Sequence, residues 1–232
     1  MNSCATCAVR KMAICQSLSE SDLDALNRLG HRQTIEQGQT LQWEGEDSLM
    51  VGNVIDGVLK LSSSSQSGRD QTLGIVFPAD FIGRPFGQTS NHSIVALTDA
   101  KICAFPRAAF DDFACDHPDL EHSLLRRTLT ELDRTRQWMI LLGRKSATER
   151  VAAFLLEMAD RLTENGERGE TMPHRFALPF GRQEIADLLG LTIETVSRQI
   201  TRLREEGVIE TPGRRGIVIL DRGALEVRAG NG

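Results

Sequence analysis

Residues 181–209, GRQEIADLLGLTIETVSRQITRLREEGVI, decide the fold of the C-terminal part of the chain. The first apolar residues of this stretch fall on one face of a short helix, and Gly190 permits a tight turn after it. Thr192 is suited to cap a second helix. Apolar residues recur along this second helix at i, i+4 and i+7: Val196, Ile200 and Leu203. Two short helices joined by a glycine turn are typical of a helix-turn-helix.

The opposite face of the second helix carries Glu194, Ser197 and Arg198 near its N-terminal end, which is the end that enters the major groove in this motif. Arg can bind guanine, Glu can accept from cytosine N4, and Ser leaves room for a thymine methyl group. An ordinary Glu–Arg pair on a solvated helix face is the alternative. A basic turn follows and predicts a β-hairpin wing with phosphate contacts. The complete predicted DNA-binding set is Thr192, Glu194, Thr195, Ser197, Arg198, Arg202, Arg214 and Arg215.

A long helix is expected before this motif, because Leu120 to Leu142 contains no Gly or Pro. Its apolar residues form a narrow, heptad-like seam that is typical of pairing with a second copy of the same helix. The alternative is a helix that lies on its own β-domain. The predicted seam consists of Leu125, Leu129, Leu132, Arg136, Met139 and Ile140.

The preceding residues, from about Leu18 to Leu120, alternate glycine turn signals with short apolar runs such as GVLKLS and KICAFP. Many short strands at this spacing predict an antiparallel sandwich or barrel. With 232 residues, 40% of them hydrophobic, the chain is long enough for two such folded parts.

Composition excludes several classes of protein. No apolar run approaches the roughly 20 residues that a bilayer requires, and the N-terminal stretch lacks the apolar core of a signal peptide. A cytoplasmic protein without a membrane partner is therefore expected. The net charge of −5 argues against indiscriminate coating of nucleic acid and favours a focused DNA-binding surface.

Three of the five cysteines lie in the first fifteen residues, as Cys4, Cys7 and Cys15. A reducing cytosol and an odd cysteine count argue against a disulfide framework, so metal binding or redox sensing is expected. Four thiolates can hold an iron–sulfur cluster if a fourth comes from the folded body, where Cys103 and Cys115 are the candidates. A tetrahedral zinc site would use the same thiolates.

The helix-turn-helix with its wing, the long helix and the β-rich part together resemble the CRP/FNR transcription factors over nearly the whole chain. The resemblance implies an α+β fold: an N-terminal cyclic-nucleotide-binding-like antiparallel β-barrel (jelly roll), a long dimerisation helix and a C-terminal winged helix-turn-helix. The expected boundaries are 1–17 for a cysteine-rich leader, 18–118 for the barrel, 119–145 for the dimerisation helix and hinge, and 146–232 for the DNA-binding domain.

The pattern E-x-x-S-R at Glu194, Ser197 and Arg198 resembles the FNR branch of this family, which implies a homodimer on TTGAT-N₄-ATCAA sites. The branch also implies a [4Fe–4S] cluster held by the three leader cysteines and a body cysteine in the context x-C-x-[IF]-P. Cys103 matches that context and Cys115 does not, so Cys115 is expected to be a free, partly buried thiol.

The barrel departs from the family's cyclic-nucleotide pattern. Arg84 replaces the glutamate that takes the ribose hydroxyl, and His92 stands where the phosphate-binding arginine belongs. Since both anchors are lost, no cyclic nucleotide is expected to bind.

The resemblance therefore implies an oxygen-responsive transcription regulator, with RNA polymerase as a further partner. A labile cluster would promote dimerisation and DNA binding when oxygen is scarce and would be lost on oxidation. A regulator of the same fold with a zinc or thiol-redox sensor is the alternative. An enzyme is not expected, because no catalytic constellation is anchored by a recognisable motif.

Overall fold

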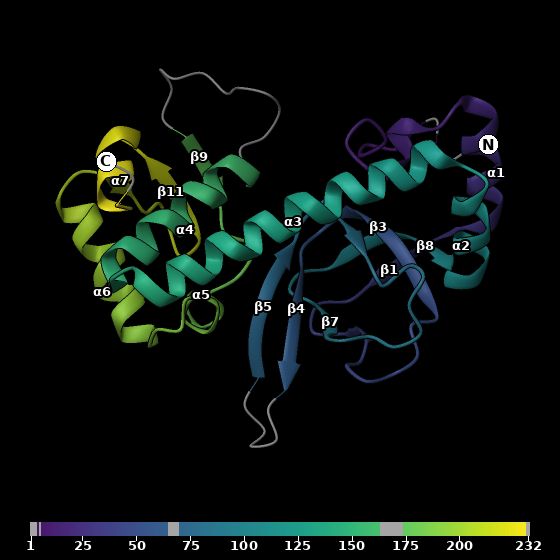
Figure 1. Cartoon of the computed structure of the whole chain (residues 1–232). Helices are drawn as coiled ribbons and strands as arrows, with labels where there is room; N and C mark the ends of the chain where they lie inside the picture. The colour runs from purple at the N-terminus through teal and green to yellow at the C-terminus, as the bar shows by residue number, and fades with distance from the viewer. Residues whose placement is uncertain (1–3, 5, 65–69, 163–173, 231–232) are drawn as a thin grey trace. The chain divides into compact units, whose positions relative to one another are not determined.

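The computed structural model describes residues 4, 6–64, 70–162 and 174–230, so residues 1–3 and 5 of the predicted leader lie outside the described part. The chain divides into two compact units, residues 1–132 and 133–232. The division falls within one continuous helix, α3 (Pro118–Arg144) (Figure 1).

The first unit contains two helical segments before its strands and, after them, one complete helix and the first part of α3. The helical segments are η1 (Ile14–Ser17), α1 (Glu20–Leu29) and α2 (Arg107–Cys115). The strands are β1 (His31–Ile35), β2 (Thr40–Gln42), β3 (Met50–Asp56), β4 (Leu59–Ser64), β5 (Asp70–Val76), β6 (Phe81–Ile82), β7 (Ser93–Ala96) and β8 (Ala100–Pro106).

These strands form two four-stranded antiparallel sheets, ordered β1-β8-β3-β6 and β2-β7-β4-β5. Apolar residues from both sheets form one shared core: Ile35, Val54, Leu59, Val76, Ile82, Ile94 and Ile102, with smaller neighbours. The antiparallel jelly-roll prediction is confirmed, but a closed barrel is wrong. Closure requires each strand to pair on both sides, whereas the edge strands of each sheet pair with one named strand only.

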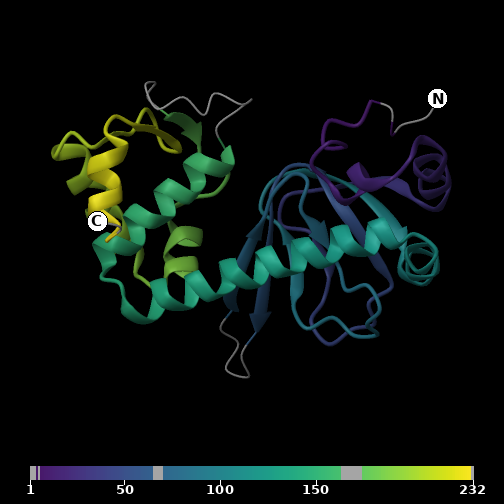
Figure 2. The same cartoon turned by 45° about the horizontal axis from the view of Figure 1, so that its top comes forward.

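The other face of β3 and β8 is covered by the leader, by α1 and α2 and by the start of α3. Side chains alternate along β8, so that Ile102 and Ala104 enter the shared core while Cys103 and Phe105 face the helices. A second apolar cluster fills this layer: Ile14, Leu26, Val51, Phe105, Phe110, Ala114, Leu120 and Leu124. Figure 2 shows the leader, in purple, close to these elements.

The second unit holds the predicted helix-turn-helix. Its elements are the end of α3, α4 (Ala147–Leu162), α5 (Arg182–Leu189), α6 (Ile193–Glu205), α7 (Arg222–Arg228) and a sheet ordered β10-β11-β9. The strands are β9 (His174–Ala177), β10 (Ile209–Glu210) and β11 (Gly216–Ile219). A capping box formed by Ser146 and Glu149 starts α4. Gly190, with a φ of 61°, closes α5 and allows the turn into α6.

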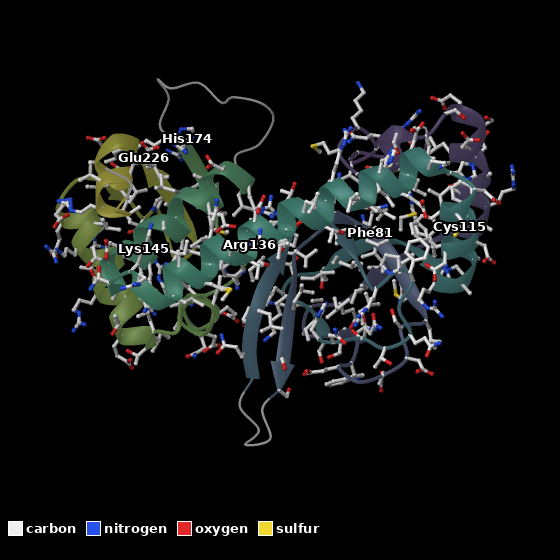
Figure 3. The ribbon with its side chains drawn as sticks, viewed as in Figure 1. Phe81, Cys115, Arg136, Lys145, His174 and Glu226 are labelled. Carbon is white, nitrogen blue, oxygen red and sulfur yellow. The ribbon has the colours of Figure 1, made fainter. Side chains whose placement is uncertain are left out.

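The predicted long helix is confirmed as α3. Its predicted seam is exposed along the helix: Leu125, Leu129, Leu132, Arg136, Met139 and Ile140. Arg136, labelled in Figure 3, forms an ion pair with Asp133 of the same helix at 3.3 Å. Within the described residues, no helix is long and apolar enough to cross a membrane.

Candidate metal centre and nucleic-acid interface

The leader folds back on itself in short hydrogen-bonded turns. The amide of Cys7 donates to the Cys4 carbonyl at 3.2 Å, and the amide of Ala13 donates to the Val9 carbonyl at 2.8 Å. Val9 and Ala13 are buried and pack against Ala79 of the first unit. This packing holds the leader cysteines against the body of the unit.

Four of the five cysteines line a single pocket in the first unit. The thiols of Cys4, Cys7 and Cys15 come from the leader, and that of Cys103 comes from β8. The remaining walls are mainly apolar: Val9, Ala13, Leu23, Leu26, Ile55 and Phe105, with Arg10 and Asn53. The structure thus brings the three leader cysteines together with the fourth predicted ligand, Cys103, which is far from them in the sequence.

Cys115 does not line this pocket. It is the last residue of α2, labelled in Figure 3, and its side chain is exposed. The expectation of a partly buried thiol is therefore wrong. The reason is the helical phase of α2, which turns Phe110 and Ala114 inward and leaves Cys115 on the outer side.

The strand pair β3–β8 determines what lies beside Cys103. Asn53 is the direct cross-strand partner of Cys103, and both side chains face the pocket. Gly52 precedes Asn53, and a Cβ atom at this glycine would lie 2.4 Å from the Cys103 carbonyl oxygen. The absence of a side chain at Gly52 therefore permits the two strands to approach closely beside the thiols.

Two of the thiols are strongly affected by burial. Desolvation raises the pKa of Cys15 to about 11 and that of Cys103 to about 12, and the charges of the neighbouring cysteines add to both shifts. Cys4 donates a hydrogen bond from its Sγ to Asn27 Oδ1 at 3.1 Å. Metal binding here would have to displace protons, since thiolates are the ligands.

The donor set fits a thiolate-ligated group, because four cysteine sulfurs surround one apolar pocket, and soft thiolates bind zinc and iron–sulfur clusters. In this structure the four cysteines form part of the wall of the pocket. Among the described residues, no three Cys, His, Asp or Glu side chains are arranged around a single metal position.

Arg127 connects the leader to α3. Its guanidinium donates to the Met12 carbonyl of the leader and, at 3.0 Å, to the carbonyl of Ala79. Met12 lies between Cys7 and Cys15, so the segment that joins two pocket thiols is held directly by the long helix.

The second candidate site lies on α6. Thr192 caps this helix by accepting a hydrogen bond from the Thr195 amide at 3.2 Å. Val196, Ile200 and Leu203 are buried, while Glu194, Ser197 and Arg198 are exposed on the other side. Hydrogen bonds from its own backbone amide and from Thr192 lower the pKa of Glu194. This face therefore presents a carboxylate, a hydroxyl and a guanidinium together.

A basic groove lies between α6 and the β10–β11 wing. The predicted residues Ser197, Arg214 and Arg215 line it. The structure adds residues that were outside the predicted set: Arg182, Thr201 and Arg204. Arg182 begins α5 and is far from the wing in sequence, so only the folded arrangement reveals its place in the groove. Arg202 pairs with Glu206 at 2.9 Å and is not among the groove residues.

The two residues that depart from the cyclic-nucleotide pattern differ in exposure. Arg84 is exposed, whereas His92 is half-buried, and burial lowers the pKa of His92. Glu44 opposes this shift and Arg84 adds to it.

A helix-turn-helix with an exposed polar recognition face and a basic wing defines a DNA-binding protein. Residues 149–228 match the Crp-like helix-turn-helix domain, and residues 32–117 match the cyclic nucleotide-binding domain. The chain belongs to the Crp/Fnr family of transcription regulators. It is a transcription regulator and not an enzyme, as its relatives are transcriptional activators.

Among its relatives, the transcriptional activator protein FnrL of Cereibacter sphaeroides is 37% identical, over 100% of this chain and 93% of the relative. A probable transcriptional activator of Rhizobium leguminosarum bv. viciae is 43% identical over 96% and 91%. The solved structure of FixK2 from Bradyrhizobium japonicum superposes with a TM-score of 0.78 at 31% identity, covering 85% of this chain and 96% of that chain.

Proposed function

We propose that this protein is an oxygen-responsive, homodimeric transcription regulator of the FNR type. Cys4, Cys7, Cys15 and Cys103 hold a [4Fe–4S] cluster, and the cluster-bearing protein binds TTGAT-N₄-ATCAA sites and engages RNA polymerase when oxygen is scarce. A bound cluster supplies an oxygen-labile centre. The observation that carries the proposal is the convergence of these four thiols on one apolar pocket.

The pocket suits this role because it is built from two separate parts of the chain. Three ligands belong to the leader and the fourth to a strand of the sandwich, so ligation ties the leader to the body of the first unit. The raised thiol pKa values of Cys15 and Cys103 leave these ligands protonated when no metal is bound. The described part of the leader is then held by its packing, by hydrogen bonds and by the ion pair between Arg10 and Glu20.

Arg127 transmits the state of the leader to α3. It binds the carbonyl of Met12, which lies between two ligands, and its own helix carries the exposed apolar seam. Ligation fixes the leader in the position that Arg127 recognises and so favours the form of α3 that pairs with a second copy. Loss of the ligated group releases this restraint.

Dimerisation places two α6 helices on one palindromic site. In each half-site, Arg198 binds the guanine of TTGAT, while Glu194 and Ser197 contact neighbouring bases. The arginines of the basic groove, among them Arg214 and Arg215, contact phosphates and set the register.

Anaerobic purification followed by iron and sulfide analysis and a visible spectrum tests the cluster. The cluster-bearing protein should be brown. The brown colour, the iron and anaerobic DNA binding should all be lost in each of four variants: Cys4→Ser, Cys7→Ser, Cys15→Ser and Cys103→Ser. The matched control Cys115→Ser should keep all three, because its thiol lies outside the pocket.

Two outcomes would contradict the proposal. A colourless protein that contains zinc in place of iron would establish the zinc or thiol-redox alternative. Iron loss from Cys115→Ser together with iron retention by Cys103→Ser would show that the fourth ligand is assigned incorrectly.

A further inference from the structure

Asn53 is a buried polar residue that the fold itself leaves without a full set of partners. Its side chain is 2% exposed, and its Oδ1 accepts no hydrogen bond within the described part of the chain. Burying an amide group without its hydrogen bonds destabilises a folded protein, because the group loses the hydrogen bonds that it makes with water in the unfolded chain. A leucine at this position of β3 would avoid that cost, so the presence of an amide requires an explanation.

The location of Asn53 supplies one. It lines the pocket formed by the four thiols, and it is paired directly across the β3–β8 ladder with Cys103. Directly opposed residues in such a ladder have Cβ atoms about 5 Å apart, which is within reach of a side-chain amide. Apart from Arg10 and the thiols, Asn53 is the polar side chain of a lining that is otherwise apolar.

We infer that Asn53 is a positioning residue for the thiolate-bound group: its amide N–H donates a hydrogen bond to the sulfur of Cys103 or to a sulfur of the group that Cys103 binds. The inference rests on the proposed function. An amide suits both states of the site, because its oxygen can accept from a protonated thiol and its nitrogen can donate to a thiolate once the proton has left.

The physical effect follows from the apolar surroundings. Apart from Arg10 and Asn53, the lining of this pocket is apolar and offers few dipoles to stabilise the negative charge of four thiolates, so one N–H donor has a large effect. Hydrogen bonds to sulfur also stabilise the reduced form of an iron–sulfur cluster and thereby raise its reduction potential. Asn53 should therefore strengthen metal binding and make the cluster harder to oxidise.

The first test uses Co(II), whose thiolate charge-transfer absorption reports binding to the full-length, metal-free protein. The Co(II) affinity of Asn53→Leu should be lower than that of the unmodified chain by about tenfold or more, as is usual when a hydrogen-bond partner of a metal ligand is removed. Urea unfolding of the metal-free variant should show equal or greater stability, because an unsatisfied buried group has been replaced by an apolar one. A merely structural Asn53 would give the opposite pair of results.

Gln42 provides the matched control. It is another buried amide without partners for Oε1 and Nε2 among the described residues, but it lies on β2 and does not line the pocket. Gln42→Leu should leave Co(II) affinity unchanged. Equal Co(II) affinities for Asn53→Leu and Gln42→Leu would overturn the inference.

Two further measurements keep the inference independent of variant folding and of the cluster. In the unmodified protein loaded with ¹¹³Cd, the side-chain amide protons of Asn53 should show scalar coupling to the metal across the N–H···S bond, and its absence would overturn the assignment. In cluster-loaded protein, Asn53→Leu should have a more negative midpoint potential. If the unmodified chain takes up no iron and sulfide, the proposed function fails, while the Co(II) and ¹¹³Cd results still decide the role of Asn53.

Discussion

The cysteine side chains differ in their surroundings far more than their spacing in the sequence indicates. Cys15 and Cys103 are half-buried with pKa values raised to about 11 and about 12, whereas Cys115 is exposed at the end of a helix. The thiolate is the reactive form, so reactivity should follow both exposure and the thiolate fraction.

In metal-free protein at pH 8, brief treatment with iodoacetamide should label Cys115 first and leave Cys15 and Cys103 largely unmodified. A pKa near 11 leaves about one thiol in a thousand ionised at that pH. Because the pKa is raised, the thiolate fraction of Cys15 increases with pH, and its labelling should be about a hundredfold faster at pH 10. Peptide mass spectrometry measures the order, and equal labelling of Cys103 and Cys115 at pH 8 would contradict the burial described here.

Arg198 is the residue on which base specificity should depend most. Arg198→Ala should cost about 1–3 kcal/mol per half-site and relax the preference for guanine, since a guanidinium can bind two acceptors on that base. Arg204→Ala, in the basic groove, should weaken binding to consensus and mutated sites alike. A gel-shift series with both operators separates the two effects, and unchanged discrimination by Arg198→Ala would exclude the proposed docking.

The helices were predictable from the periodicity of their apolar residues. The phase of apolar residues in α6 and the uninterrupted run of α3 determine both their extents and their faces. The same reasoning did not define β1 and β3, since β1 is largely exposed and polar and β3 contains the polar and small residues Gly52 and Asn53. A period of two cannot distinguish a closed barrel from two facing sheets, because both require the same alternation.

The candidate site, too, was only partly predictable from the sequence. The four thiols were predictable from spacing and resemblance, but Asn53 was not, because its position depends on the register between β3 and β8. That register is determined by tertiary packing and by the close approach at Gly52. The basic groove was only partly predictable for the same reason, as Arg182 joins it through the fold alone.

The contact between Arg127 and the leader leads to a prediction about dimerisation through α3. Arg127→Met should retain iron and sulfide, since its side chain does not line the thiol pocket, but should weaken anaerobic dimerisation about tenfold through the loss of two charge-assisted hydrogen bonds. Analytical ultracentrifugation under nitrogen measures the effect. Arg126→Met, at the exposed neighbouring position, should behave like the unmodified protein. Loss of iron from Arg127→Met would show that the residue supports the pocket itself.

The exposed seam of α3 combines an apolar stripe, which favours the association of two copies, with a charged residue, which opposes it. Met139 is 69% exposed and Leu125 55%, so pairing of two copies would bury a substantial apolar stripe. Arg136 interrupts the stripe, and its pairing with Asp133 within the same helix is exposed and therefore weak. This arrangement supports a dimer whose formation depends on a further stabilising signal.

Arg136→Leu should consequently dimerise at least about tenfold more tightly in the metal-free state, because an apolar side chain replaces a charge that must be desolvated. Sedimentation of the metal-free proteins measures the monomer–dimer equilibrium. Asp133→Asn is the second variant of this test. It removes the intrahelical ion-pair partner of Arg136 and should therefore weaken dimerisation. An unchanged equilibrium for both variants would remove the seam from the dimer interface.

The thiol pocket also imposes an order of events on biosynthesis. During translation the leader with its three cysteines leaves the ribosome before Cys103, which lies on the last strand of the sandwich. A nascent chain halted before that strand presents three thiols and no pocket, and delivery of iron and sulfide to it would leave the leader incompletely ligated. On the proposed function, assembly of the cluster must therefore follow completion of the folded domain, so that only fully folded molecules become competent regulators.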